Sequence, residues 1–266
     1  MSKTILITGS TDGIGLETAG ILVERGHTVL IHGRSEEKVE KTKLTLLAKN
    51  AKATIYDYVA DLSDLSDVRY LAEDIADDHE QLDVLINNAG VFRSPKQVSA
   101  EGYDIRFIVN SIAPYLLTKH LLTRLKPKGR VVNLSSAAQS PVNLQALRGQ
   151  TQVPDEMSAY AQSKLALTMW SNHLAKQRGE NDPIVFSVNP GSMLGSKMVR
   201  EGFGVAGNDI RIGATAVVRA TLDAEFSHAA GKYFDNDIGR FGSPHPDALN
   251  PEKCAALAET IEDIIA

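Results

Sequence analysis

The sequence has a single cysteine, and this scarcity limits what can hold the fold together. Cys254 cannot form an internal disulfide, so the stability of the 266-residue chain must come from packing, and a reducing cytoplasm is the expected compartment. No segment reaches the roughly 18 uninterrupted apolar residues of a membrane span. The first residues lack the apolar core of a signal peptide. We therefore predict a cytoplasmic protein with no membrane partner.

An excess of positive charge is also missing. The net charge of -5 argues against nucleic acid as a main partner, and a small molecule is the expected ligand. No cluster of histidine and cysteine has the spacing of metal ligands, so we expect no catalytic metal. Hydrophobic residues make up 43% of the chain and charged residues 23%, which is typical of a soluble globular protein.

Short apolar, β-branched runs alternate with longer segments of helical periodicity. The runs predict about seven strands, at 4–8, 28–32, 53–59, 84–87, 130–134, 184–189 and 231–234. Helices are expected at 14–25, 36–50, 65–79 and 104–125, with another beginning near residue 159. This alternation predicts a single α/β domain over 1–266, with a doubly wound, Rossmann-type parallel sheet and helices on both faces.

Two loop-rich stretches, 136–160 and 190–209, interrupt this alternation and leave the same edge of the sheet. In parallel sheets, ligands bind beyond the carboxyl ends of the strands. The glycine-rich segment 191–209 is expected to cover the substrate as a lid that orders when cofactor or substrate binds. Its apolar side chains favour an apolar or aromatic substrate, although they equally suit a helix core; they are Met193, Leu194, Met198, Val199 and Phe203.

The stretch TGSTDGIG, residues 8–15, follows the first predicted strand and opens directly into a helix. Gly9 suits a tight turn, Gly13 lets the backbone approach a diphosphate, and Gly15 allows close packing of helix on strand. The free N–H groups and the dipole of the helix favour phosphate at this point. The stretch therefore predicts a nucleotide site.

The stretch YAQSK places a tyrosine and a lysine one helical turn apart, at Tyr160 and Lys164. A positive charge about 5 Å away is expected to lower the pKa of the phenol by roughly two units, toward the range of a general acid–base. Taken alone, the pair equally suits a solvated helix face.

Ser136 has no histidine placed to activate it, which argues against a serine hydrolase.

Seven motifs in order give the chain a family resemblance: TGSTDGIG, DL at 61–62, NNAG at 87–90, Asn110, NLSS ending at Ser136, YAQSK, and NPG ending at Gly191. In this pattern the chain resembles the short-chain dehydrogenase/reductase family. The helix after Tyr160 and the long insertion before it look most like the retinol-dehydrogenase-like branch of that family. The resemblance extends from Thr4 to Phe234.

The resemblance implies four catalytic residues: Asn110, Ser136, Tyr160 and Lys164. Tyr160 would exchange a proton with the substrate oxygen, which Ser136 would orient, with Ser135 as the alternative. Lys164 would also bind the ribose of the nicotinamide. Asn110 would join a water-linked relay to Lys164, and the alternative for this buried amide is a hydrogen bond between helices.

The resemblance also implies a nicotinamide cofactor. The residues expected to bind it are Gly9, Thr11, Asp12, Gly13, Ile14, Gly15, Arg34, Asp61, Leu62, Asn88, Ala89, Gly90, Tyr160, Lys164, Pro190, Gly191, Ser192, Met193 and Ser196. NNAG is expected mainly to support the sheet edge. Asp61 would bind the adenine amino group unless it caps the next helix, which Asp64 could also do. Ser196 follows Gly195, which occupies the position of the family's usual threonine.

NADP(H) is expected rather than NAD(H), although NAD(H) stays possible. The second strand ends in Gly33 and Arg34, where relatives that prefer NAD place an acid. Glycine repels no 2′-phosphate, and the planar guanidinium of Arg34 suits one. The alternative for Arg34 is an ordinary exposed arginine.

These features predict an NADP(H)-dependent oxidoreductase that acts on a carbonyl compound or alcohol, as a homodimer or homotetramer. One alternative is a nucleotide-binding regulatory or scaffold protein, which would be free to lose Tyr160 or Lys164. Another is a nucleotide-sugar epimerase, which shares the Tyr–Lys pair but normally carries a larger substrate domain.

Overall fold

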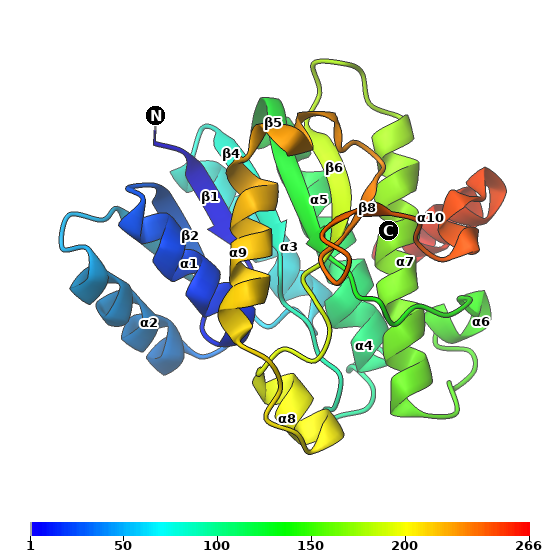
Figure 1. Cartoon of the computed structure of the whole chain (residues 1–266). Helices are drawn as coiled ribbons and strands as arrows, with labels where there is room; N and C mark the ends of the chain where they lie inside the picture. Colours follow the sequence, from blue (N-terminus) through cyan, green and yellow to red (C-terminus); the bar gives the residue numbers. More distant parts are fainter. Residues whose placement is uncertain (1) are drawn as a thin grey trace.

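A computed structural model describes residues 2–266, which form an eight-stranded sheet between two layers of helices (Figure 1). The strands are β1 (Thr4–Ile7), β2 (Thr28–Gly33), β3 (Ile55–Val59), β4 (Leu82–Asn87), β5 (Leu125–Leu134), β6 (Ile184–Asn189), β7 (Tyr233–Asp235) and β8 (Arg240–Gly242). Their order is β3-β2-β1-β4-β5-β6-β7-β8. The order reverses between β1 and β4, so the predicted doubly wound, Rossmann-type sheet is confirmed.

The sheet has one strand more than the sequence predicts. Strands β1 to β7 pair in parallel, whereas β8 pairs antiparallel with β7 in a hairpin. Strand β8 has only three residues, all at least partly exposed, so it leaves no apolar run in the sequence. The hairpin nevertheless matters, because its turn contacts the loop after β6.

Helices cover both faces of the sheet, as predicted. One layer contains α1 (Gly13–Glu24), α2 (Glu36–Lys49) and α9 (Ile210–Leu222); the other contains α3 (Leu65–Asp78), α5 (Ala113–Leu121) and α7 (Glu156–Lys176). Each layer buries its own apolar core against the strands. A further helix, α10 (Pro251–Ile265), packs against α7 through buried side chains that include Leu257 and Ile261.

Two helices differ from the sequence prediction. Helix α7 begins at Glu156, one turn before the predicted start, because Asp155 caps it by accepting a hydrogen bond from the Ser158 amide (2.9 Å). Tyr160 therefore lies in the second turn of the helix. The helix expected at 104–125 is instead α4 (Ile105–Phe107), a π-helical turn (Ile108–Ile112), α5 and a 3₁₀ turn (Leu122–Arg124).

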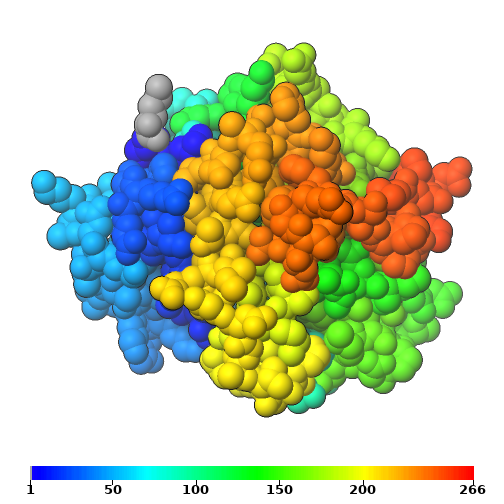
Figure 2. Space-filling view, in the orientation of Figure 1, coloured from blue at the N-terminus to red at the C-terminus, as the bar shows by residue number. Residues whose placement is uncertain are grey.

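The carboxyl edge of the sheet carries the two loop-rich stretches. The first contains α6 (Leu144–Leu147) and the second contains α8 (Lys197–Phe203), which lies beyond the strand ends (Figure 1). In the space-filling view, α8 and its flanking segments project from this side of the molecule (Figure 2). The remaining helical turns are 3₁₀ segments at Ala224–His228 and Pro246–Leu249. Across residues 2–266, no helix combines the length and the hydropathy needed to cross a membrane.

Candidate active site

Tyr160 and Lys164 lie on the same face of α7, where this helix passes the end of β5. Lys164 is buried, with 4% of its surface exposed, and its Nζ donates a hydrogen bond to the Leu134 carbonyl (2.8 Å). The same Nζ lies 5.8 Å from the centre of the Tyr160 ring. An ammonium in this position is not on a solvated face, so that alternative for the pair is wrong.

Ser136 and Ser135 follow β5 and point in different directions. The Ser135 hydroxyl is buried against α7, where it shares a hydrogen bond with the Thr168 hydroxyl (2.7 Å). The Ser136 hydroxyl interacts with the phenol of Tyr160 and accepts a hydrogen bond from the Ala138 amide (3.1 Å). The geometry therefore places Ser136, and not Ser135, beside Tyr160.

The pKa of Tyr160 differs from the sequence expectation. Burial raises the pKa of the phenol above its ordinary value, and the hydrogen bond with Ser136 opposes this only in part. The ammonium of Lys164 is directed at the Leu134 carbonyl, so the lysine does not produce the expected lowering in the protein alone. Burial also lowers the pKa of Lys164 to about 8. The phenol is therefore protonated at neutral pH.

Asn110 lies in the π-helical turn and is completely buried. Its side chain accepts a hydrogen bond from the Val91 amide (2.7 Å) and donates to the Val91 carbonyl (2.9 Å) and the Ser163 hydroxyl (2.9 Å). The hydrogen bond to α7 predicted as the alternative is thus present. Asn110 Oδ1 and Lys164 Nζ both lie 3.3 Å from the point that a Cβ of Gly90 would occupy, so a side chain at position 90 would crowd both groups.

The glycine-rich turn after β1 packs directly on the NNAG turn after β4. Gly9 has φ +63°, and a Cβ there would lie 2.8 Å from the Ala89 Cα. The Asn88 side chain donates hydrogen bonds to the carbonyls of Thr8 (2.8 Å) and Gly9 (2.9 Å). A Cβ at Gly15 would meet both this amide and the Gly9 carbonyl at 2.4 Å. From the sequence, Gly15 is expected to allow close packing of the helix on the strand. In the structure, Gly15 packs closely against the two turns instead.

His32 fixes the turn from the neighbouring strand β2. Its Nδ1 accepts a hydrogen bond from the Gly9 amide (3.1 Å), which leaves the proton on Nε2 for the Ala60 carbonyl (3.1 Å). Burial lowers the pKa of His32 to about 4, so the ring is neutral at physiological pH. The sequence contains no motif that identifies this residue.

The amino end of α1 leaves room for an anion. Asp12 caps the helix and accepts a hydrogen bond from the Gly13 amide (2.7 Å). Gly13 has φ +60°, and the nearest atom to a Cβ there, on Ile210, would be 3.8 Å away. The space next to Gly13 and Ile14 therefore suits a phosphate group.

Arg34 lies exposed at the end of β2, and within residues 2–266 no acidic side chain comes within salt-bridge distance of it. Thr11 covers Gly33: a Cβ on Gly33 would lie 2.5 Å from the Thr11 Cγ2 and 3.0 Å from the Val39 Cγ2. Any side chain at position 33 would therefore displace Thr11, so the glycine is required by packing as well as by charge.

Asp61 and Leu62 follow β3. Asp61 accepts hydrogen bonds from the amide (2.9 Å) and hydroxyl (2.8 Å) of Ser63, whereas Asp64 caps α3. Asp61 is therefore not the helix cap. Leu62 is 6% exposed and packs in the core, which leaves its backbone, and not its side chain, for a cofactor.

The loop after β6 is held by the β7–β8 turn. Asp237 accepts a hydrogen bond from the Ser192 amide (2.7 Å), and Asn236 donates to the Pro190 carbonyl (3.0 Å). Burial works to raise the pKa of Asp237, but the hydrogen bonds from Ser192 and Asn189 together outweigh burial and lower this pKa. Gly191 adopts φ +120° and Met193 φ +53° in this loop.

Ser196 caps α8, where its hydroxyl accepts a hydrogen bond from the Val199 amide (3.2 Å). The expected contact of Ser196 with a cofactor would therefore compete with the helix cap.

Two aromatic residues near Tyr160 are not predicted as site residues from the sequence. Tyr233, which is buried on β7, donates a hydrogen bond to the Ser136 carbonyl (3.0 Å) and so fixes the peptide of this serine. Phe92, two residues after NNAG, packs edge-on against the Tyr160 ring, with 5.4 Å between ring centres. Their only sequence signal is position: Phe92 follows NNAG, and Tyr233 begins β7.

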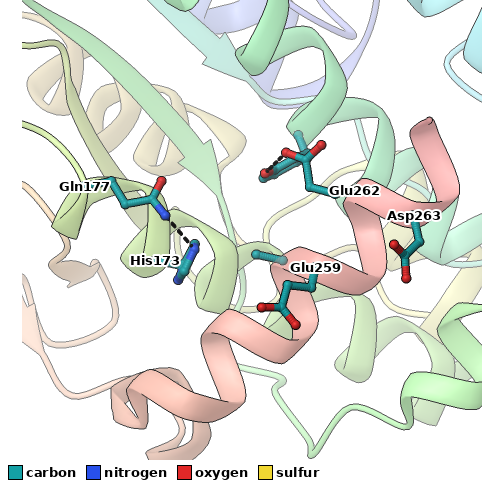
Figure 3. Close-up of a pocket in the computed structure, with 7 residues that line it drawn as sticks. His173, Gln177, Glu259, Glu262 and Asp263 are labelled. Atoms are coloured by element: carbon teal, nitrogen blue, oxygen red, sulfur yellow. Dashed lines mark hydrogen bonds between the residues drawn. The ribbon is translucent and has the colours of Figure 1, made fainter.

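A cavity of about 250 Å³ lies elsewhere, between α7 and α10 (Figure 3). Its walls include His173, Gln177, Glu259, Glu262 and Asp263. His173 lies 13 residues after Tyr160 on α7, about 20 Å along the helix axis. The cavity is therefore separate from the Tyr160 site. Among residues 2–266, no three His, Cys, Asp or Glu side chains are grouped to hold a metal ion.

Comparison with known proteins places the chain in a family. Residues 3–203 match the family model for short chain dehydrogenase. Human retinol dehydrogenase 13 is 29% identical over 96% of this chain and 82% of its own length. Bovine retinol dehydrogenase 12 is 37% identical over 76% of this chain and 64% of its own length. The chloroplastic short-chain dehydrogenase TIC 32 A of Brassica napus is 33% identical over 87% of this chain and 79% of its own length.

Solved structures of known proteins resemble this fold. An uncharacterised protein from Mycobacterium Paratuberculosis superposes with a TM-score of 0.80 at 28% identity, over 99% of this chain and 93% of its own. A Burkholderia cenocepacia short chain dehydrogenase in complex with NADP has a TM-score of 0.69 at 27% identity, over 90% and 97% of the two chains. The NADP complex of Pseudomonas aeruginosa RhlG has a TM-score of 0.71 at 25% identity, over 89% and 95%. The chain belongs to the short-chain dehydrogenase/reductase family of oxidoreductases, within its retinol-dehydrogenase-like branch.

Proposed function

We propose that this protein is an NADP(H)-dependent oxidoreductase that interconverts a carbonyl compound and an alcohol, with Tyr160 as general acid–base. The observation that carries the proposal is the arrangement of Tyr160, Ser136 and Lys164 around the end of β5. Two structural relatives, RhlG and the Burkholderia protein, are described with bound NADP, which supports the same cofactor here.

Different segments of the chain would bind different parts of NADP(H). The amino end of α1 at Gly13 and Ile14 would bind the diphosphate, and Arg34 the 2′-phosphate. Asp61 with the backbone of Leu62 would contact the adenine, and Asn88, Ala89 and Gly90 would line the adenosine side. Lys164 would bind the nicotinamide ribose. The loop after β6 would contact the nicotinamide through Pro190, Gly191, Ser192 and Met193. The Asn236 and Asp237 side chains hold this loop in place.

The bound nicotinamide would give or accept a hydride, and its oxidised form would add positive charge near Tyr160. Ser136 orients the substrate oxygen toward the phenol. In reduction, Tyr160 donates its proton to this oxygen, and the raised pKa keeps the proton in place beforehand. We infer that a water between Asn110 and Lys164, in the space that Gly90 leaves, returns the proton.

The substrate is inferred to be small to medium in size and apolar. Segment 191–209 places Met193, Phe203 and Val205 on the surface at this edge of the sheet, each at least 40% exposed. A cytoplasmic location and a homodimer or homotetramer stay predictions. The alternative is a regulatory or scaffold protein of the same fold, which would show no turnover. The direct test is NADPH absorbance: it should fall when the enzyme reduces a panel of apolar aldehydes and ketones, and it should rise when the enzyme oxidises the corresponding alcohols with NADP.

Replacing Tyr160 with Phe should reduce kcat by about 10²- to 10⁴-fold and leave the Kd for NADPH within a few-fold, because the ring keeps its packing but has no proton to donate. Steady-state kinetics and cofactor fluorescence measure the two quantities. Tyr70→Phe, on the exposed face of α3, is the matched control and should leave both unchanged. Turnover by Tyr160→Phe near the wild-type rate would show that the tyrosine is not the acid.

The buried ammonium of Lys164 should make stability depend on pH. Its pKa is lowered from 10.5 to about 8, so between these pH values the unfolded chain binds a proton that the folded chain does not. The free energy of unfolding of the wild type should therefore rise with pH in this window, relative to Lys164→Met, by up to about 3 kcal/mol. Urea denaturation of both proteins from pH 7.5 to 10 tests this. A constant difference between them would contradict it.

Replacing Arg34 with Leu should weaken NADPH binding roughly 10- to 150-fold, because a charge-assisted contact to the 2′-phosphate is lost, and leave NADH binding unchanged. Arg34 is replaced alone because an aspartate at Gly33 would collide with Thr11. Arg25→Leu, after the last turn of α1, is the matched control. Equal weakening of both cofactors, or of neither, would remove Arg34 from the 2′-phosphate site.

A further inference from the structure

A histidine at each end of β2 accepts a hydrogen bond from a main-chain amide beside β1. Before the strand, His27 Nδ1 accepts from the Lys3 amide (3.1 Å), at the amino edge of the sheet. Near the end of the strand, His32 Nδ1 accepts from the Gly9 amide, also at 3.1 Å, at the carboxyl edge. Only the second contact lies at the edge where the proposed cofactor residues are found. His32 is 2% exposed, and the proposed proton transfer does not use it.

The turn after β1 is held from two sides. The Gly9 amide donates to His32 on β2, and the Gly9 carbonyl accepts a hydrogen bond from the Asn88 side chain after β4 (2.9 Å). At Ser10, the main-chain amide donates to the His32 carbonyl (2.9 Å), and the hydroxyl accepts from the His32 amide (2.9 Å). The Gly9 amide is therefore engaged by His32, so Gly9 shapes the turn rather than donating to a phosphate.

The same ring reaches the segment after β3 through its other nitrogen. His32 Nε2 donates to the Ala60 carbonyl (3.1 Å), and the Ala60 amide donates to the Gly33 carbonyl (3.2 Å). Ala60 is thus bonded to the end of β2 through both of its peptide groups, and Asp61 follows it directly. One imidazole therefore connects the turn proposed to bind the diphosphate with the residue before Asp61, which is proposed to contact the adenine.

This arrangement needs a neutral imidazole. The His32 ring accepts at Nδ1 and donates at Nε2 at the same time, which a protonated ring cannot do because both of its nitrogens are donors. Burial lowers the pKa of His32 more than the Ala60 carbonyl and the Asp61 carboxylate together raise it. An aliphatic side chain at this position would leave the buried Gly9 amide without its acceptor.

We propose that His32 is a positioning residue for the adenosine half of NADP(H), which holds the diphosphate turn and the adenine segment in one arrangement without contacting the cofactor itself. This rests on the proposed function. When His32 is lost, the turn shifts and one charge-assisted hydrogen bond to the diphosphate is broken, which weakens cofactor binding roughly 10- to 150-fold. Tyr160 and Lys164 make no hydrogen bond to His32, so turnover at saturating NADPH stays within a few-fold of the wild-type rate.

The first test measures the binding of 2′-phospho-ADP-ribose, which lacks the nicotinamide, by calorimetry. His32→Leu should raise its Kd roughly 10- to 150-fold and raise the KM for NADPH by the same factor, with kcat within a few-fold. His27→Leu is the matched control, because it removes the same kind of contact from the other end of β2. It should lower thermal stability and leave both constants unchanged.

Two results of this test would count against the account, and they differ. An unchanged Kd in His32→Leu, or a loss confined to kcat, would overturn the positioning role of His32. A wild type that binds neither NADPH nor 2′-phospho-ADP-ribose would instead refute the proposed function.

The second test separates the two nitrogens of the ring and applies even where His32→Leu does not fold. His32→Asn places an amide oxygen near the position of Nδ1 and can keep the Gly9 contact, whereas His32→Gln places an amide nitrogen near Nε2 and can keep the Ala60 contact. Hydrogen exchange should show the Gly9 amide protected in His32→Asn and exposed in His32→Gln. Both variants should bind 2′-phospho-ADP-ribose more weakly than the wild type. A wild-type Kd in both would show that neither contact positions the cofactor site.

Discussion

The buried ammonium of Lys164 is the interaction on which the rest of the site depends. A lysine with 4% of its surface exposed needs a fixed partner, because desolvation disfavours its charge, and the Leu134 carbonyl at the end of β5 supplies one. This hydrogen bond joins α7 to the sheet at the point where Ser136 follows the strand. It also holds the ammonium 5.8 Å from the centre of the Tyr160 ring, so this contact lies between the proposed acid Tyr160 and the strand end that carries Ser136.

The neighbouring turns are arranged by close packing rather than by charge. Gly9, Gly15 and Gly90 each lie where a Cβ would fill the space that another group needs. Gly9 and Gly15 bring the turn after β1 against the NNAG turn, and the Asn88 amide satisfies the carbonyls exposed there. Gly90 separates Asn110 from Lys164. The proposed cofactor side and the proposed proton-transfer side of the site thus both pack on the NNAG turn.

Much of this could be predicted from the sequence, because its signals are local. The inner strands of a parallel sheet are buried on both faces, so they leave apolar runs, and the glycine turn follows the first of them directly. Strand β8 has three partly exposed residues and leaves none. The start of α7 depends on the cap at Asp155, which lies inside a loop-rich stretch.

The parts of the site that could not be predicted are contacts between distant segments. Phe92 meets Tyr160 and Phe203 only in the folded chain, and Tyr233 on β7 reaches Ser136, after β5, across the intervening strand β6. The direction of the Tyr160 pKa also depends on burial and on the aim of the Lys164 side chain, which spacing alone does not give.

We infer that Tyr160 and Ser136 together hold the reacting oxygen. A crystal structure of the protein with NADP and an alcohol product tests it most directly. We expect the alcohol oxygen to lie within hydrogen-bonding distance of both the Tyr160 phenol and the Ser136 hydroxyl. An alcohol oxygen bound away from Tyr160, with the cofactor in place, would contradict the account.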